Sequence, residues 1–200
     1  MITFLGKNIS LFLCKKNIIS KEETDIYQYG FETIMSTVLG FVITLVMGFA
    51  FKMALLSVIY YGVFVTLRQL TGGYHADSYL KCNIVFSFVT FFVLGMTKLM
   101  CISQMYTISL HLLLLLITVI CIWHFAPVEN LNKPLTLKQK DRNHKISLVI
   151  LSVLCILSNV LYAIKTDFAV LIALTLFGIS MLIIIEKLKG GQEAHEESTK

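Results

Sequence analysis

Charged side chains are scarce in this 200-residue sequence: 14% of its residues are Asp, Glu, Lys or Arg, whereas 56% are hydrophobic. A soluble domain carries about 25% charged residues, because it needs them to cover its surface. The mean hydropathy is +0.79. These values exclude an ordinary soluble globule and predict a protein embedded in a lipid bilayer.

The sequence also lacks the motifs of several common kinds of site. It has no CxxC pair and an odd number of widely spaced cysteines, which argues against a disulfide framework and against a zinc site. It has no HExxH motif, and we expect no metal and no other cofactor. The net charge of +5 comes from basic residues that lie between apolar runs rather than on one face, so we expect no nucleic-acid partner. The cysteines are Cys14, Cys82, Cys101, Cys121 and Cys155.

Six apolar stretches are long enough to cross a bilayer, which takes about 20 residues for a helix. We therefore expect an all-α protein, a polytopic membrane helix bundle of about six transmembrane helices with an N-terminal interfacial amphipathic helix. The expected spans are about 33–51, 53–70, 83–100, 105–126, 146–164 and 168–186.

The segments outside the spans define the expected organisation. Large apolar residues alternate with lysines near the N-terminus, a pattern typical of a helix lying on a membrane surface. Ser20 and Glu23 have the spacing of a capping box, so a second helix is expected to begin at Ser20. The expected parts are one membrane-embedded domain (1–187), its interfacial helix (2–19), a polar segment (68–82), a basic cytoplasmic loop (127–145) and a flexible cytoplasmic tail (188–200).

The distribution of basic residues predicts the orientation. Fourteen of the 17 lysines and arginines lie before the first span, in the connections around 68–82 and 127–145, or after the last span. The other three are Lys52, Lys98 and Lys165. Because basic loops stay on the cytoplasmic side, both termini and the 68–82 segment are expected to be cytoplasmic.

Residues 68–82 read Arg-Gln-Leu-Thr-Gly-Gly-Tyr-His-Ala-Asp-Ser-Tyr-Leu-Lys-Cys and concentrate polar and potentially reactive groups at a membrane boundary. A thiol and an imidazole, from Cys82 and His75, can form a nucleophile–base pair. On one straight helix they would lie about 10 Å apart along the axis, which is too far for a hydrogen bond of about 3 Å. We therefore expect His75 in a loop that folds back over a helix carrying Cys82.

The residues between the pair fit such a turn. Gly72 and Gly73 supply backbone freedom, and Asp77 or Ser78 is a suitable N-cap for the next helix. Cys82 would then lie near the positive end of the helix dipole, which favours its thiolate form. A competing interpretation is that the cysteine and the histidine have no catalytic role, and that they pack against neighbouring helices with their polar groups directed toward the membrane interface.

Arg68, Gly72-Gly73-Tyr74-His75-Ala76 and Cys82 resemble the signature of the AgrB family, the membrane peptidases of Gram-positive quorum-sensing systems. The resemblance covers roughly the whole membrane region. It includes the amphipathic N-terminal segment, the six spans and the Ala126-Pro127…Asn132-Lys133-Pro134 loop with the basic residues that follow. It implies a multi-pass protein of a bacterial cell membrane.

The resemblance also implies an activity. AgrB proteins cleave an AgrD-type propeptide on its C-terminal side and join the new C-terminus to an internal cysteine or serine, which gives a cyclic thiolactone or lactone. By this likeness the domain 1–187 is a membrane-embedded peptidase domain with its catalytic segment at 68–82, where Cys82 is the nucleophile and His75 the general base. Arg68, Gly73 and Lys133 also match family positions and are candidates for supporting or substrate-binding roles. The third, orienting residue stays open among Asp77, Ser78 and Glu32.

The expected partners are the propeptide and the lipid bilayer. The basic loop could attract an acidic segment of the propeptide, and the interfacial helix could dock a leader helix. Six short spans enclose little space for a peptide, which is compatible with a homodimer. The alternative functions are a membrane transporter, which would place charged residues deep in its spans, and a non-catalytic membrane scaffold.

Overall fold

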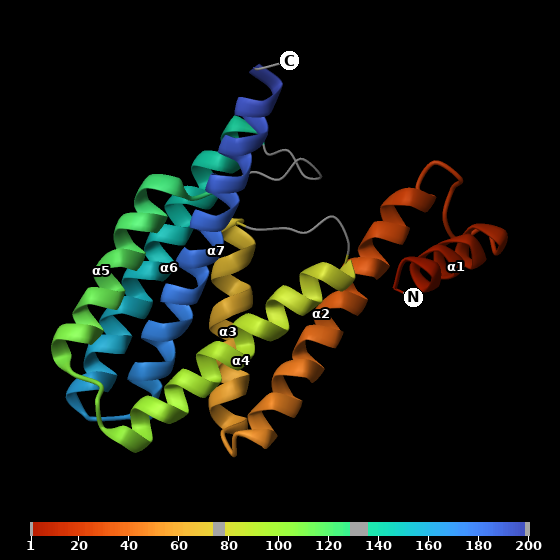
Figure 1. Ribbon diagram of the computed structural model, residues 1–200. Helices are drawn as coiled ribbons and strands as arrows, with labels where there is room; N and C mark the ends of the chain where they lie inside the picture. The colour runs from red at the N-terminus through yellow and green to blue at the C-terminus, as the bar shows by residue number, and fades with distance from the viewer. Residues whose placement is uncertain (1, 74–78, 129–135, 199–200) are drawn as a thin grey trace.

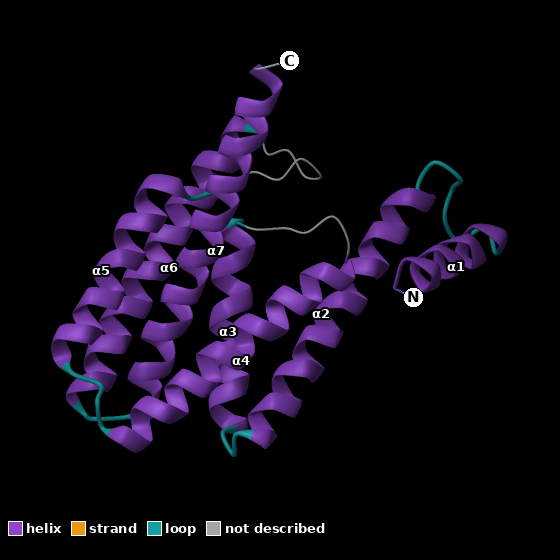
Figure 2. Cartoon of the chain, in the orientation of Figure 1, coloured by secondary structure: helices purple, strands orange, loops and turns teal. Residues whose placement is uncertain are grey.

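The computed structural model describes residues 2–73, 79–128 and 136–198. Within these residues the chain forms seven helices and no strand (Figures 1 and 2). The six helices that follow the first are long and apolar enough to cross a membrane. The expected all-α class and the number of spans are therefore confirmed. The helices are α1 (Ile2–Lys15), α2 (Thr24–Ala50), α3 (Ala54–Thr71), α4 (Tyr79–Ser103), α5 (Ile108–Phe125), α6 (Leu137–Ala163) and α7 (Asp167–Ser198).

The core of the bundle is built around α7. Its most apolar window of 18 residues has a mean hydropathy of 2.8, the highest of the six spans, and Leu171, Ile179 and Ile183 are fully buried. α7 packs against α3, α4, α5 and α6. A helix that is apolar on all sides suits this central position, because protein rather than solvent surrounds it. α7 continues to Ser198, past the point where the tail was expected to begin; the flexibility of 188–200 stays a prediction.

The remaining spans surround α7 and α3. In Figure 1, α3 stands between the α5–α6–α7 group and α2, and α2 packs against both α3 and α4. The outward faces carry exposed apolar side chains, among them Val46, Phe88 and Leu116. Such faces are those expected of helices surrounded by lipid.

α1 confirms the helix expected near the N-terminus, although it ends at Lys15 rather than at residue 19. It packs against α2 beside Gly6, where a Cβ atom would lie 2.7 Å from Cγ of Glu32. Phe4 and Phe12 are exposed on α1. Exposed aromatic residues next to lysines fit a helix in a membrane interface, and that location stays a prediction.

The starts of two helices differ from the expectation. Glu23 accepts hydrogen bonds from the backbone and the hydroxyl of Ser20, both at 2.9 Å. The Glu23 amide, however, donates to the Ser20 carbonyl in a turn, and α2 begins at Thr24 with Glu23 as its N-cap. The expected helix start at Ser20 is therefore wrong.

A complete capping box lies instead at α6. The Thr136 amide donates to Gln139 Oε1 at 3.0 Å, and the Gln139 amide donates to Thr136 Oγ1 at 3.3 Å. Both bonds satisfy amides that a helix start leaves without partners. α6 therefore begins at Leu137, and residues 137–145 of the expected basic loop belong to a helix.

Candidate active site

The predicted catalytic segment joins α3 to α4. α3 ends at Thr71 and α4 begins at Tyr79, so Cys82 is the fourth residue of α4. This agrees with the expectation that Cys82 lies on the helix after His75. His75, Asp77, Ser78 and Lys133 lie outside the described residues, and the expected return of His75 toward Cys82 stays a prediction. The end of the bundle where α3 ends and α4 begins is called the 68–82 end below.

Two glycines end α3 in conformations that other residues rarely adopt. Gly72 has φ +66° and Gly73 has φ +113°. At Gly72 a Cβ atom would overlap the carbonyl oxygen of Val128. The Val128 amide donates to the Thr71 carbonyl at 2.8 Å, and residues 72 and 128 form an isolated bridge. The connections α3–α4 and α5–α6 are therefore in direct contact, which sequence reasoning missed.

The connection after α5 is held by a second contact. Nδ1 of His144, on α6, lies 2.7 Å from the carbonyl oxygen of Ala126. Together with the Val128–Thr71 bond, this contact fixes the described part of the α5–α6 connection beside Gly72. His124, near the end of α5, is exposed.

Gly73 is in close contact with Arg68. A Cβ atom at Gly73 would overlap Nη1 of Arg68, and it would lie 3.4 Å from the carbonyl oxygen of Leu182 on α7. Nη1 has no contact with solvent. The guanidinium therefore lies in a space bounded by the glycine turn and by α7. Arg68 and Gly73 are therefore neighbours in the structure, and their supporting or substrate-binding roles stay predictions.

Arg68 interacts electrostatically with Cys82 and with Glu186. Glu186 lies one turn beyond Leu182, on the same face of α7, and its Oε2 atom is shielded from solvent. A shielded guanidinium requires a nearby negative charge, because an unpaired ion is costly to remove from water. Sequence reasoning missed Glu186, whose signal was an acidic residue directly after an apolar run of 18 residues, 168–185.

Glu32 is one of the residues considered for the orienting role, and that role stays a prediction. It is buried on α2 and accepts a hydrogen bond from Nε2 of Gln28 at 2.8 Å. Tyr79, the first residue of α4, also interacts with it. With Gly6 against its Cγ, Glu32 links α1, α2 and the start of α4.

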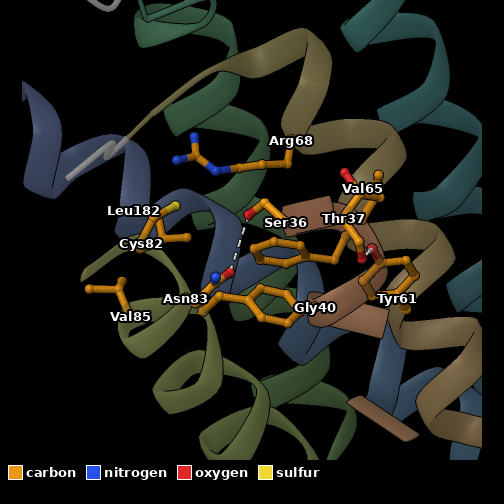
Figure 3. A pocket seen from close by; sticks show the side chains of 12 residues that line it. Ser36, Thr37, Gly40, Tyr61, Val65, Arg68, Cys82, Asn83, Val85 and Leu182 are labelled. Atoms are coloured by element: carbon orange, nitrogen blue, oxygen red, sulfur yellow. Dashed lines mark hydrogen bonds between the residues drawn. The ribbon is translucent and has the colours of Figure 1, made fainter. Parts of the chain in front are cut away.

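A cavity of about 160 Å³ opens beside Cys82 between α2, α3, α4 and α7. Arg68 and Cys82 lie at its 68–82 end, and Tyr61 and Gly40 lie toward the other end (Figure 3). Ser36 Oγ donates to Asn83 Oδ1 across the cavity at 3.4 Å. Within the described ranges, no group of three or more His, Cys, Asp or Glu residues could hold a metal ion.

The fold and site define a polytopic membrane helix bundle with a half-buried cysteine beside a shielded arginine at one end. The family model for accessory gene regulator B matches residues 4–185. The chain therefore belongs to the accessory gene regulator B (AgrB) family.

Relatives from clostridia agree with this assignment. An AgrB-like protein of Clostridium perfringens strain SM101 is 28% identical, with 81% of this chain and 79% of the relative aligned. An AgrB-like protein of Clostridium beijerinckii is 30% identical, with 94% and 92% aligned. The names of these relatives assign no activity. No solved structure matches the chain.

Proposed function

We propose that this protein is a membrane cysteine endopeptidase that cleaves an AgrD-type propeptide through a Cys82 acyl-enzyme and closes the product into a cyclic thiolactone or lactone. The observation that carries the proposal is the position of Cys82. It lies in the first turn of α4, lines a cavity, and interacts with Arg68. Membership of the AgrB family supplies the substrate class.

In the first chemical step His75 takes the thiol proton of Cys82, and the sulfur attacks the carbonyl carbon of the scissile peptide bond. The carbon–nitrogen bond then breaks, and His75 returns the proton to the departing amine. In the second step an internal thiol or hydroxyl of the substrate gives its proton to His75 and attacks the thioester. The bond between the carbonyl carbon and the Cys82 sulfur breaks, the ring closes, and the Cys82 thiolate takes the proton back from His75. With a substrate thiol, one thioester replaces another at nearly equal free energy.

The surroundings of Cys82 suit this chemistry. The positive charge of Arg68 can stabilise both a thiolate and the oxyanion that forms at the attacked carbonyl. Glu186 balances that charge between reaction cycles. A site at a membrane boundary also admits little water, and this protects the thioester from hydrolysis before the ring closes.

We further propose that the 68–82 end faces the cytoplasm of a bacterial cell, where a newly made propeptide is found. The contact between the α3–α4 and α5–α6 connections supports this, because both connections then lie on the side richer in basic residues. In this orientation Lys133 and its basic neighbours attract the acidic segment of the propeptide, and α1 lies on the lipid surface. A homodimer stays part of the proposal, since α1 and α2 extend away from α5–α7 (Figure 1).

The direct test uses purified protein in proteoliposomes with a synthetic AgrD-type propeptide. We expect Cys82→Ala and His75→Ala to lower the cleavage rate by about 10³-fold or more, since each removes a member of one catalytic unit. Hydroxylamine should trap the acyl-enzyme of the wild-type protein as a hydroxamate of the fragment N-terminal to the cleaved bond. Cleavage by Cys82→Ala at the wild-type rate would contradict the proposal.

Cys101→Ala is the matched control. It is the same substitution on the same helix, about 28 Å from Cys82 along the axis, and should leave the rate unchanged. Peptide movement across the vesicle wall without cleavage would favour the transporter, and binding without either would favour the scaffold.

A further inference from the structure

The cavity beside Cys82 is lined by polar residues near the 68–82 end and by aromatic rings farther from that end. Arg68, Cys82 and Asn83 lie near the 68–82 end, whereas Tyr61 lies two helical turns below Arg68 on α3, about 10 Å along the axis. Phe86 lies one turn below Cys82 on α4. Figure 3 shows this arrangement, with Arg68 and Cys82 on one side of the cavity and Tyr61 and Gly40 on the other. A molecule attached to Cys82 would therefore meet polar groups first and aromatic rings below them.

The deeper walls leave few polar atoms for an occupant. The Tyr61 hydroxyl donates to the Thr37 carbonyl at 2.6 Å, and nearer the 68–82 end Ser36 donates to Asn83. Phe86 contacts the rings of Tyr61 and Phe64 at centroid distances of 6.2 and 5.3 Å. Because the polar groups are engaged with one another and the rings cluster, the lower cavity favours an apolar occupant.

The volume sets the size of that occupant. A protein cavity of about 150 Å³ accommodates one benzene molecule. The cavity here, of about 160 Å³, is therefore large enough for one leucyl or phenyl side chain and too small for a folded segment of peptide.

We propose that this cavity is the subsite for the side chain of the substrate residue whose carbonyl carbon is joined to Cys82, and that it selects an apolar side chain of leucine or phenylalanine size. The proposal rests on the proposed function and deepens it. The argument for this occupant is position: Cys82 lines the cavity, so a residue bound to its sulfur has its side chain within a few ångström of the opening. A lipid chain has no such attachment.

The subsite can be filled without disturbing the backbone. Gly40 lies in α2 with an ordinary helical conformation, and a Cβ atom there would lie 3.4 Å from the Phe86 ring and 3.6 Å from the Tyr61 ring. Gly40→Leu therefore places a side chain in the lower cavity. Gly62→Leu is the matched control, because a Cβ atom at Gly62 on α3 would meet nothing within 4 Å.

The experiment compares two propeptides that differ only in the residue before the cleaved bond, phenylalanine or alanine, with wild type, Gly40→Leu and Gly62→Leu in proteoliposomes. We expect wild type and Gly62→Leu to prefer phenylalanine by about tenfold or more in kcat/KM, the range for apolar pockets. Gly40→Leu should lose that preference, so that its kcat/KM for the phenylalanine substrate falls to about its own value for the alanine substrate.

A second variant guards against loss of folding. Phe86→Ala enlarges the cavity and should raise kcat/KM for a naphthylalanine substrate relative to phenylalanine, a gain that an unfolded protein cannot show. The proposal is overturned if wild type shows no preference, if Gly40→Leu lowers both rates equally, as displacement of a lipid would, or if Phe86→Ala leaves the preference unchanged. Cys82-dependent cleavage without side-chain selection refutes the subsite alone, whereas cleavage that does not need Cys82 refutes the proposed function.

Discussion

Replacing Gly73 by alanine should disturb the site in two separable ways. The backbone at Gly73 has φ +113°, a conformation that costs a residue with a side chain about 1–3 kcal/mol. The added methyl group would also overlap Nη1 of Arg68. A free-energy change of 1.36 kcal/mol corresponds to tenfold in rate. The backbone strain alone should therefore lower kcat/KM by about 5- to 150-fold, if it raises the free energy of the catalytically competent conformation only.

The overlap with Arg68 adds a second loss, which a double-mutant cycle isolates. In an Arg68→Ala background the guanidinium is absent, so Gly73→Ala should then cost only the strain. We expect a coupling between the two positions of about 0.5–3 kcal/mol, the range for residues in contact. The measurement is propeptide cleavage in proteoliposomes, with the rate of Cys82 alkylation as a second readout where cleavage is slow.

Gly62→Ala is the control for this cycle, because a methyl group there meets no other atom and alanine favours a helix over glycine by about 1 kcal/mol. It should be active and slightly more stable. If Gly73→Ala keeps wild-type activity, both the strain and the overlap are wrongly assigned. If the two losses simply add, then Gly73 does not act through Arg68.

Two further predictions concern helix starts outside the site. Thr136→Ala removes one bond of the α6 capping box and should destabilise the first turn of α6 by about 0.5–2 kcal/mol, seen as faster exchange of the Gln139 amide; unchanged exchange would contradict the assigned cap. Hydrogen bonds from the Ser20 backbone and hydroxyl lower the pKa of Glu23 below its ordinary value of 4.5. A lowered carboxyl pKa stabilises the folded state above that value, and the gain is lost as pH falls through the folded-state pKa. Protection of the Ser20 amide should therefore exceed that in Glu23→Gln at neutral pH and approach it in acid, and a difference that persists at low pH would contradict this.

The six spans could be predicted from sequence because each is a run of apolar residues and membrane burial rewards every residue of such a run. The helix ends were less accurate. Thr136 caps α6 through its side chain, whereas the Ser20–Glu23 pair has the same spacing and forms a turn that precedes α2. The spacing is identical, but the Gln139 amide donates to the side chain of Thr136, whereas the Glu23 amide donates to the backbone carbonyl of Ser20.

The candidate site was accessible to sequence reasoning only where its residues are neighbours in the chain. Cys82 and Gly73 belong to one short segment and were found together. Glu186 comes from α7, more than 100 residues away, and approaches Arg68 because α7 packs against both α3 and α4. The contact of Val128 with Thr71 depends on the packing of α5 in the same way. No pattern of neighbouring residues in the sequence indicates these contacts between distant segments.

The electrostatic interaction of Arg68 with Glu186 bears on the proposed mechanism, because a site at a membrane boundary admits little water. Under the proposed mechanism the thiol proton moves from Cys82 to His75, so a negative and a positive charge form together. The site has no net charge before the reaction, because the charges of Arg68 and Glu186 cancel. It still has no net charge after the proton transfer, because the Cys82 thiolate and the His75 imidazolium also cancel. Creating one net charge away from water would be far more costly. An arginine alone would favour the thiolate but oppose the imidazolium, which must later protonate the leaving amine. The acidic partner on α7 removes that conflict, so the positive charge beside Cys82 can assist attack without preventing the proton transfer that completes it.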